Sequence, residues 1–366
     1  LRCNYCLRNL EQEENCISTE KLRDIGKFIT TYCDEYKIAN ISVQAWGGEP
    51  LLEKNKIIAL TKFITPQKTK VHYSIETNAT LLTNDVIEEL YKNHIGIGIS
   101  IDGDRKCHDL QRTFVSGKGS YDTVKKNLLQ AQRYYKNKIG TITTITKQTA
   151  VHIEKIIEHL VLDLHISNIK LNFVHASTYT HGQNQCLNTQ EIADTELRIL
   201  YKIIELQERG YDVMEHNIFI KLKNLLFREY ADICLSCGCC GGKKMIVFDM
   251  DGNIYPCELT DDASFVIGSI YKKESLIEQI KMTIDKDKAF FKMKKAVECE
   301  KCYWKFFCRG GCTVRALSEK RQMEVIDIDH IECAINQVLY PALMELVLRK
   351  PHIVNQMLGE DLLVDE

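Results

Sequence analysis

The feature that most constrains this chain is the distribution of its sixteen cysteines. Ten of them lie between residues 234 and 333, whereas the rest of the chain holds six. The sequence has no run of about 18 apolar residues and starts without the pattern of a signal peptide, so we expect a cytoplasmic location. In a reducing cytoplasm, clustered cysteines bind metals or act in catalysis and rarely form disulfides. The dense block therefore predicts a metal-binding domain.

The remaining cysteines and the charge balance carry weaker expectations. We expect small buried side chains at Cys16, Cys33, Cys107 and Cys186, because a lone thiol behaves as a small hydrophobe. The 48 basic residues nearly balance the 50 acidic ones. This balance gives no sign of a nucleic-acid or membrane partner, so neither is expected.

The first half of the chain alternates short β-rich runs with amphipathic patterns, which predicts parallel strands joined by helices. Strands are expected at 41–46, 71–75, 95–101, 139–145 and 169–174. Helices are expected at 18–37, 53–64, 84–93, 120–137 and 150–163. Two more helices are expected over 189–230, short strands or turns at 245–248 and 265–270, and a last helix over 332–348.

Glycines and polar side chains directly follow the predicted strands. The Gly47-Gly48-Glu49-Pro50 turn follows the first strand, Asn78 follows the second, and Ser100 stands at the end of the third. A parallel barrel places its chemistry at the carboxyl ends of its strands. We therefore expect these residues to face a common site.

The pair Cys3 and Cys6 forms a C-x2-C motif, which alone fits a redox pair, half a zinc site or half an iron–sulfur site. Such a loop should follow a strand, so we expect a first strand upstream of Leu1. The Gly47-Gly48-Glu49-Pro50 turn adds information, because two glycines let a ligand approach the backbone and a carboxylate can bind an ammonium group.

Together these motifs resemble those of the radical S-adenosylmethionine (SAM) superfamily, in which C-x3-C-x2-C follows the first barrel strand and Gly-Gly-Glu-Pro the second. Cys3 and Cys6 match the second and third cysteines, and the first would lie two residues before Leu1. The resemblance implies a [4Fe-4S] cluster with one open iron that binds the amine and carboxylate of SAM. It also implies SAM contacts from Tyr5 at the adenine, Gly47, Gly48 and Glu49 at the methionine amine, Asn78 and Ser100 at the ribose or carboxylate, and Arg112 at the carboxylate. A surface position is the alternative for Arg112.

The cysteine-rich block has a regular spacing. It reads C-x2-C-x5-C-x3-C from residue 299 to residue 312, with a later Cys333, and a G-x4-C motif ends at Cys257. Structural zinc sites are the alternative to iron–sulfur clusters here, because two of them use eight ligands.

This pattern resembles the SPASM extension of radical SAM enzymes at all seven of its cysteine positions. The resemblance implies two auxiliary [4Fe-4S] clusters, the nearer held by Cys234, Cys240, Cys257 and Cys312, the outer by Cys299, Cys302, Cys308 and Cys333. Cys237 and Cys239 are left over, and either could ligate instead. A nearer cluster with three ligands would leave an iron open to a substrate thiol, which ligation deprotonates.

Glu258 directly follows Cys257 and is expected near the space between SAM and the nearer cluster. In the sulfatase-maturating enzymes that the chain resembles, an aspartate at this place serves as the base. A glutamate keeps the carboxylate, so Glu258 is a candidate general base, with a solvated loop carboxylate as the alternative.

The expected fold is α/β, a partial (β/α)6 TIM-like barrel with a helical bridge and a small cysteine-rich SPASM domain. The expected limits are 1–188 for the barrel, 189–233 for the bridge, 234–335 for the SPASM domain and 336–366 for a C-terminal helix and tail.

The resemblance implies an oxidoreductase that uses three [4Fe-4S] clusters and SAM to generate a 5′-deoxyadenosyl radical. Its expected substrate is a ribosomally made peptide containing cysteine, its product a thioether or other side-chain cross-link, and its electron donor a flavodoxin or ferredoxin. The alternatives are a sulfatase maturase that makes formylglycine, a non-catalytic iron–sulfur electron carrier, and a zinc-binding interaction module.

Overall fold

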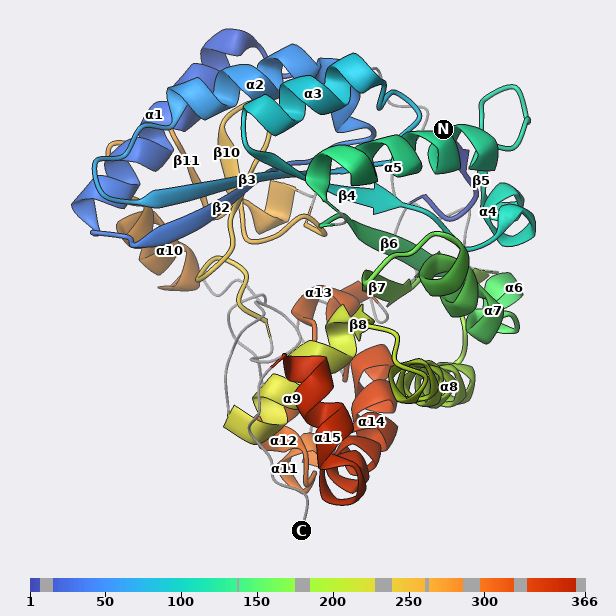
Figure 1. Cartoon of the computed structure of the whole chain (residues 1–366). Coiled ribbons are helices and arrows are strands. Elements are labelled where there is room, and N and C mark those ends of the chain that lie inside the picture. Colours follow the sequence, from blue (N-terminus) through green and yellow to red (C-terminus); the bar gives the residue numbers. More distant parts are fainter. Residues whose placement is uncertain are drawn as a thin grey trace.

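A six-stranded parallel sheet forms the upper part of the computed structural model, which describes residues 1–6, 16–136, 138–174, 185–227, 239–260, 263–285, 297–318 and 328–359 (Figure 1). In spatial order, its strands are β2 (Asn40–Ala45), β3 (Lys70–Thr77), β4 (Ile95–Ser100), β6 (Gly140–Ile145), β7 (Asn168–Phe173) and β8 (Met214–Glu215). Every neighbouring pair is parallel, so the carboxyl ends of all six strands lie along one edge. The predicted partial barrel is confirmed.

Helices cover the outer face of this sheet, and Figure 1 shows α1, α2, α3 and α5 above it. The helices of this part are α1 (Thr19–Glu35), α2 (Lys54–Phe63), α3 (Asn84–Lys92), α4 (Arg105–Gln111), α5 (Tyr121–Tyr135), α6 (Lys147–Ala150) and α7 (Ile153–Glu158). A short 3-10 helix, η1 (Pro50–Glu53), precedes α2. Side chains fix several helix starts; Ser18, for example, accepts a hydrogen bond from the Lys21 amide at 3.1 Å.

The two faces of the sheet differ in polarity because strand residues alternate between them. Ile75, Ile99 and Ile169 point outward and are buried against the helices. On the opposite face, Glu76 and Ile142 flank Gly98, where an added Cβ would lie within 3.5 Å of either side chain. This inner face is only half-buried and largely polar, so it is the side of the sheet available to ligands.

Three segments differ from the sequence expectations. The helix expected at 150–163 is divided into α6, α7 and a π turn at His159–Asp163, because Thr146 and Thr149 cap a separate short helix through an N–H to Oγ1 bond of 3.0 Å. The predicted bridge contains α8 (Thr189–Glu208) and α9 (His216–Phe227), with β8 between them extending the sheet. A final helix, α15 (Pro351–Leu358), lies in the expected tail.

The lone cysteines only partly match their expectation. Cys33 and Cys107 are buried as expected. Cys16 is exposed and hydrogen bonds to the Glu53 carboxylate, and Cys186 is half-buried, so the prediction of buried side chains is wrong for both.

A second, smaller sheet carries part of the cysteine-rich segment. It consists of β9 (Val247–Phe248), β10 (Asn253–Tyr255) and β11 (Gly268–Ser269), which are antiparallel, and α10 (Leu276–Asp285) packs on it. Gly252 makes the tight turn before β10 with a φ of +81°, as the G-x4-C motif predicts. The sheet contacts α1, where the rings of Phe28 and Phe248 lie 5.8 Å apart. The cysteine-rich segment is therefore anchored to the barrel.

The C-terminal part of the cysteine-rich segment forms short helices below the sheet (Figure 1). These are α11 (Val297–Glu300), α12 (Lys305–Cys308) and α13 (Thr313–Ser318), followed by the long α14 (His330–Arg349). Among the described residues, α14 has the length and composition that could span a membrane. Here Leu339 and Leu343 are buried in the main core, and Glu332 pairs with a buried lysine, as is typical of a core helix.

A buried ion pair joins α9 to α14. Lys221 donates to the Glu332 carboxylate and, at 2.7 Å, to the side-chain oxygen of Asn336. Both charged side chains are almost fully buried, at 1% and 4% exposure. Removing one partner of such a pair leaves an uncompensated charge in the interior.

Replacing Lys221 by methionine should therefore lower the free energy of unfolding by about 3–5 kcal/mol. The matched control is Lys350→Met, since Lys350 pairs with Glu208 at the surface and should contribute less than about 1 kcal/mol. Urea unfolding followed by circular dichroism compares the two variants. Equal destabilisation by both would contradict the role assigned to the buried pair.

Candidate active site

The first cysteines lie in a loop that is pinned against the segment after α4. β1 (Arg2–Cys3) pairs antiparallel with β5 (Arg112–Thr113), so that Cys3 lies opposite Arg112. The amide of Asn4 donates to the carbonyl of Gln111 at 3.0 Å, and a turn bond of 3.2 Å joins Cys6 to Cys3. The two thiols therefore share one turn at the edge where the sheet strands end.

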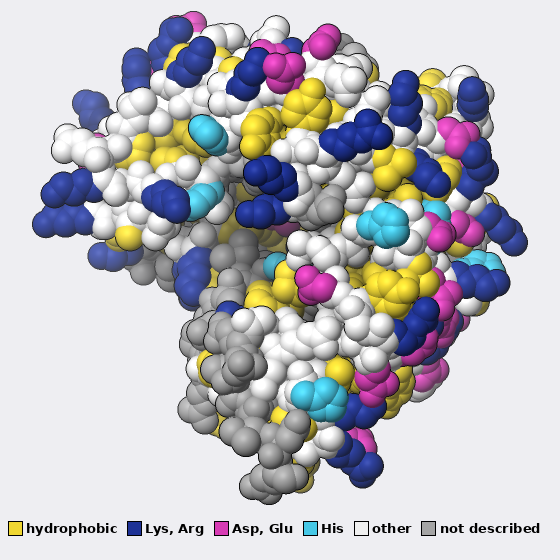
Figure 2. Space-filling view, viewed as in Figure 1, with side chains coloured by type: hydrophobic (Ala, Val, Ile, Leu, Met, Phe, Trp, Pro, Cys, Tyr) yellow, Lys and Arg dark blue, Asp and Glu magenta, His cyan; other side chains and the backbone are white. Residues whose placement is uncertain are grey.

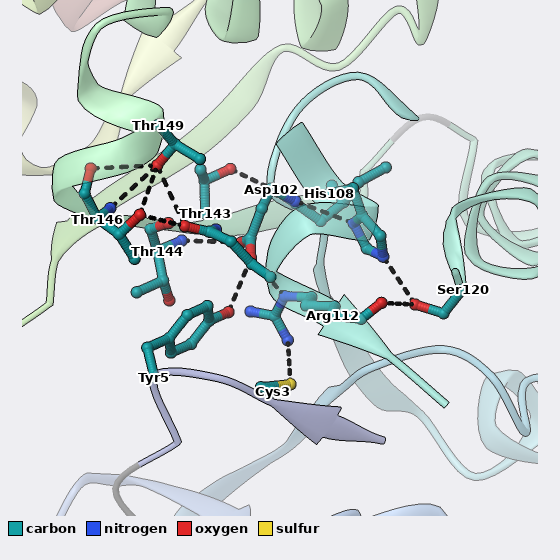
Figure 3. Close-up of polar contacts among 12 residues, drawn as sticks. Cys3, Tyr5, Asp102, His108, Arg112, Ser120, Thr143, Thr144, Thr146 and Thr149 are labelled. Atoms are coloured by element: carbon teal, nitrogen blue, oxygen red, sulfur yellow. Dashed lines mark hydrogen bonds and ion pairs between the residues drawn. The ribbon is translucent and has the colours of Figure 1, made fainter. Parts of the chain in front are cut away.

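The carboxylate of Asp102 organises this corner of the molecule (Figure 3). Its Oδ2 accepts hydrogen bonds from the Tyr5 hydroxyl at 2.8 Å, Gln111 Nε2 at 2.9 Å and Arg112 Nε at 2.8 Å. Its Oδ1 accepts from the amide of Thr144 at 3.0 Å, and the residue has no solvent exposure. A single buried carboxylate thus joins the cysteine loop to β4, β5 and β6.

Asp102 also holds Arg112 as a buried cation. Burial is the largest influence on the pKa of Arg112 and lowers it, but Asp102, Tyr5 and Cys3 together outweigh burial and the pKa is raised. The guanidinium carbon lies 5.3 Å from the centre of the Tyr5 ring, and Nη1 lies 3.9 Å from the sulfur of Cys3. Burial raises the pKa of the Cys3 thiol, and Arg112 opposes that rise. Arg112 is therefore a buried residue, and the surface alternative is wrong.

A histidine fixes the backbone on the other side of Asp102 (Figure 3). His108 Nδ1 accepts from the Asp102 amide at 3.2 Å, which places the ring proton on Nε2 facing Ser120 Oγ at 2.9 Å. Ser120 donates in turn to the carbonyl of Arg112 at 2.8 Å. Burial lowers the pKa of His108 to about 4, so the ring is neutral at physiological pH.

The second part of the site is the turn between β2 and β3. Glu49 Oε1 accepts from the Thr77 hydroxyl at 2.6 Å and the Leu51 amide at 3.1 Å, and Oε2 accepts from the Asn78 amide at 2.9 Å. Gly47 and Gly48 are exposed, and a Cβ added to either would meet nothing within 4 Å. The structure therefore places a fixed carboxylate beside open backbone at the edge where the strands end.

The other predicted cofactor contacts also lie at this edge. The side-chain oxygen of Asn78 accepts from the amide and hydroxyl of Thr80, at 3.0 and 2.7 Å. Ser100 ends β4 on the half-buried inner face, in register with Ile142 of β6. The roles of Asn78, Ser100, Tyr5 and Arg112 toward a cofactor stay predictions.

Three of the four cysteines expected around the outer cluster are electrostatic neighbours. The pKa of Cys333 is raised by burial and then by the thiols of Cys299 and Cys302. Burial likewise raises the pKa of Cys308 to about 11. The second largest cause of this rise is the carboxylate of Glu332, the residue before Cys333. The structure therefore brings this set together around the start of α14.

The nearer set is centred on Cys257 and Cys312. Burial raises the pKa of Cys257 to about 12, and Glu258, Cys312 and Cys239 are its charged neighbours. Cys240, the predicted ligand, is buried one position further on, whereas Cys234 and Cys237 lie outside the described residues. Cys239 is a charged neighbour of both Cys257 and Cys312. The choice between Cys239 and Cys240 as the ligand stays a prediction.

A second buried aspartate holds the backbone of these two sets. Asp329 Oδ2 accepts from the amide of Cys312 at 2.8 Å and from Arg315 Nη2 at 2.6 Å. Its carbonyl accepts from the amide of Cys333 at 2.9 Å. Gly311 has a φ of +71°, and a Cβ there would lie 2.7 Å from the Asp329 carboxylate, so only glycine fits.

Glu258 has the property expected of a residue that faces a ligand. Its Oε2 is buried and has no hydrogen-bond partner among the described residues. A buried carboxylate oxygen without a partner is unfavourable. The role of Glu258 toward a substrate stays a prediction. The alternative of a solvated loop carboxylate is wrong for this oxygen.

The donor set fits iron–sulfur clusters. Thiols are the ligands that such clusters take, and the half-buried thiols come in groups of mutual neighbours. Within the described ranges, no three His, Cys, Asp or Glu side chains converge as the ligands of a single metal ion do.

Several organising residues escaped the sequence prediction. Asp102 stood at a predicted strand end without an assigned role, and a carboxylate at such a position was the signal that could have identified it. Thr77 also follows this logic, because it ends β3 next to Asn78. Nothing in the local sequence pointed to His108 or Asp329, whose roles depend on contacts made in the folded chain.

Comparison with known proteins shows which family the N-terminal part of the chain is similar to. Residues 1–160 match the sequence model of the Radical SAM superfamily. A cysteine-type anaerobic sulfatase-maturating enzyme of Clostridium novyi is 26% identical over 322 residues, covering 85% of this chain and 84% of that protein. The radical SAM cyclopropyl synthase TigE of Paramaledivibacter caminithermalis is 23% identical over 365 residues, covering 94% of this chain and 71% of that protein.

The fold agrees with a solved structure of similar length. The structure of anSMEcpe with bound AdoMet and Cp18Cys peptide superposes with a TM-score of 0.80 and 21% identity, covering 98% of this chain and 96% of that chain. The cysteine loop, the Gly47-Gly48-Glu49 turn, the parallel half barrel and the family match lead to one conclusion. Residues 1–160 of this chain are a radical SAM domain.

Proposed function

We propose that this chain is a peptide maturase that removes a hydrogen atom from a ribosomally made peptide and forms a thioether or other side-chain cross-link. The observation that carries the proposal is the unpaired, buried oxygen of Glu258 next to the cysteines of the nearer set. A base at this place has a use only if a substrate loses a proton there.

The proposed cofactors are SAM and three [4Fe-4S] clusters. Cys3 and Cys6 are ligands of the first cluster, and the two sets of C-terminal thiols hold the others. When bound, the first cluster and SAM supply a 5′-deoxyadenosyl radical. Glu49 is already oriented by three donors, so it can receive the methionine ammonium without reorganising.

The half-buried, largely polar inner face of the half barrel is the side on which the peptide would bind. Figure 2 shows that the surface is drawn in between the upper part and the lower helices, with basic and acidic side chains interspersed around it. Forming a cross-link removes two hydrogen atoms from the peptide, one as a hydrogen atom and one as a proton and an electron. When bound, SAM and the clusters would supply the radical chemistry and take up the electron, and Glu258 would accept the proton.

Sulfatase maturation is the second candidate. It is favoured by the similarity to sulfatase-maturating enzymes of matching length, whereas TigE is longer than the matched region. Against it, this chain has a glutamate, Glu258, where the sulfatase maturases have an aspartate. The added methylene moves the carboxylate, which favours a different substrate geometry. For either product, we propose a cytoplasmic enzyme reduced by a flavodoxin or ferredoxin.

The two products are distinguished by reaction of the anaerobically reconstituted full-length protein with two peptides. One is a cysteine-containing peptide from any short reading frame found beside this gene, and the other has the modified segment of a sulfatase. A cross-link removes two hydrogen atoms and a free thiol, whereas formylglycine is an aldehyde that a hydrazide probe captures. Mass spectrometry that finds neither product, despite formation of 5′-deoxyadenosine, would contradict peptide maturation by this chain.

Replacing Glu49 by glutamine should weaken SAM binding about tenfold or more, because an amide cannot accept all three hydrogen bonds and cannot balance an ammonium charge. Iron content should be unchanged. The matched control is Glu53→Gln at the end of the 3-10 helix that Glu49 caps, where the carboxylate pairs with Lys56. Isothermal titration with SAM measures both variants, and normal binding by Glu49→Gln would remove Glu49 from the SAM site.

Replacing Glu258 by glutamine should lower the rate of product formation about 100-fold or more, the range typical of a lost general base. Cluster content and SAM cleavage should stay intact, so that 5′-deoxyadenosine forms without a matching yield of modified peptide. Glu300→Gln, at an exposed glutamate between two outer cysteines, is the control. Undiminished product formation by Glu258→Gln would exclude it as the base.

A further inference from the structure

The guanidinium of Arg112 is directed at the sulfur of a proposed cluster ligand. Nη1 lies 3.9 Å from the Sγ of Cys3, within reach of an N–H to sulfur hydrogen bond (Figure 3). Nε is bound to Asp102 at 2.8 Å, and the two side chains are 8% and 0% exposed. The cation therefore approaches the cysteine loop from the protein interior.

Neither end of Arg112 is free to move. Its backbone pairs with Cys3 in the β1–β5 ladder, and its carbonyl accepts from Ser120, which His108 holds in turn. Its side chain is bound to Asp102, whose carboxylate receives four hydrogen bonds in total. The position of the charge relative to Cys3 is thus set by the fold before any cofactor binds.

A buried cation at this distance acts on the redox chemistry of a neighbouring cluster. Hydrogen bonds to ligand sulfurs and nearby positive charge both stabilise the added electron of the reduced cluster. The effect is strong here because burial weakens solvent screening. The negative charge of Asp102 acts in the opposite sense, from the far side of the guanidinium.

We propose that Arg112, positioned by Asp102, raises the reduction potential of the cluster held by Cys3 and Cys6. This role is separate from a contact with the SAM carboxylate, and it rests on the proposed cluster at the N-terminal loop. The step concerned is the transfer of one electron from an external reductant to the cluster, in which no bond forms or breaks. Arg112 is a positioning and tuning residue for this step.

The test is a potentiometric titration of the full-length, reconstituted protein without SAM, with dithionite as reductant, followed by electron paramagnetic resonance. The N-terminal cluster is identified by the change of its signal when SAM is added. Arg112→Gln should shift the reduction potential of this cluster to a more negative value. The expected decrease of about tenfold in the equilibrium constant for reduction corresponds to a shift of about 59 mV for one electron. Arg112→Lys keeps the charge and should shift it less.

Neutralising the partner gives a shift of opposite sign. Asp102→Asn removes the negative charge and should make the potential less negative. A purely structural role would disturb the loop in both variants and gives no reason for opposite signs. Arg105→Gln is the matched control, because Arg105 also pairs with an aspartate, Asp122, but at the surface. In this variant the reduction potential of the N-terminal cluster should equal that of the wild type.

An unchanged potential in Arg112→Gln, combined with weaker SAM binding, would overturn the inference and assign Arg112 to the SAM carboxylate. If Arg112→Gln assembles no cluster, the double variant Arg112→Gln/Asp102→Asn removes the buried charges as a pair. The cluster of this double variant should still have a more negative reduction potential than the wild type, because the lost cation is the charge next to Cys3. An unchanged potential in the double variant also overturns the inference. Failure of the wild type to form a SAM-sensitive cluster would instead refute the proposed function.

Discussion

The buried carboxylate of Asp102 is the contact on which the geometry of the N-terminal site depends. It receives donors from the cysteine loop, from α4, from β5 and from β6. Each of these elements alone is short; β1 and β5 are two residues each. Pairing with Arg112 makes the burial of this charge tolerable, since an unpaired carboxylate in the interior would be strongly unfavourable. The same pair brings a permanent cation to the edge where the strands end.

The C-terminal thiols depend on a similar arrangement. Asp329 is buried, pairs with Arg315, and accepts from the backbone amides of Cys312 and Cys333, which belong to different cysteine sets. Short helices and turns cannot fix thiol positions by themselves, because few of their backbone groups are internally bonded. A buried aspartate and arginine pair therefore supports the cysteines at both ends of the molecule, and Glu258 lies beside one of these sets.

Sequence reasoning identified the fold and the residues of short motifs, because both depend on local patterns. The five predicted strands match β2, β3, β4, β6 and β7, and the Gly47-Gly48-Glu49 turn lies where the strand order places it. It did not identify the partner of Arg112, since Asp102 is ten residues away and is brought in by the turn after β4. A π turn keeps the apolar periodicity of a helix, which explains why the break near His159 was invisible.

The ligand choice in the crowded run before residue 241 shows the same limit. Adjacent cysteines lie almost equally far along the sequence from any distant ligand. Sequence spacing therefore cannot decide whether Cys239 or Cys240 is the ligand. In the folded chain Cys239 lies near Cys257 and Cys312, and Cys240 is buried one position further on. Glu258 was predictable as a candidate from its place after Cys257, but the burial of its free oxygen required the tertiary structure.

The most direct measurement of the central claim is the formation of 5′-deoxyadenosine by the full-length protein, assembled with iron and sulfide without oxygen and reduced with dithionite. A SAM-cleaving cluster at the loop of Cys3 and Cys6 predicts that chromatography detects 5′-deoxyadenosine and methionine in equal amounts, with absorbance near 400 nm from the clusters. A colourless protein that binds zinc, or a coloured one that leaves SAM intact, would contradict it.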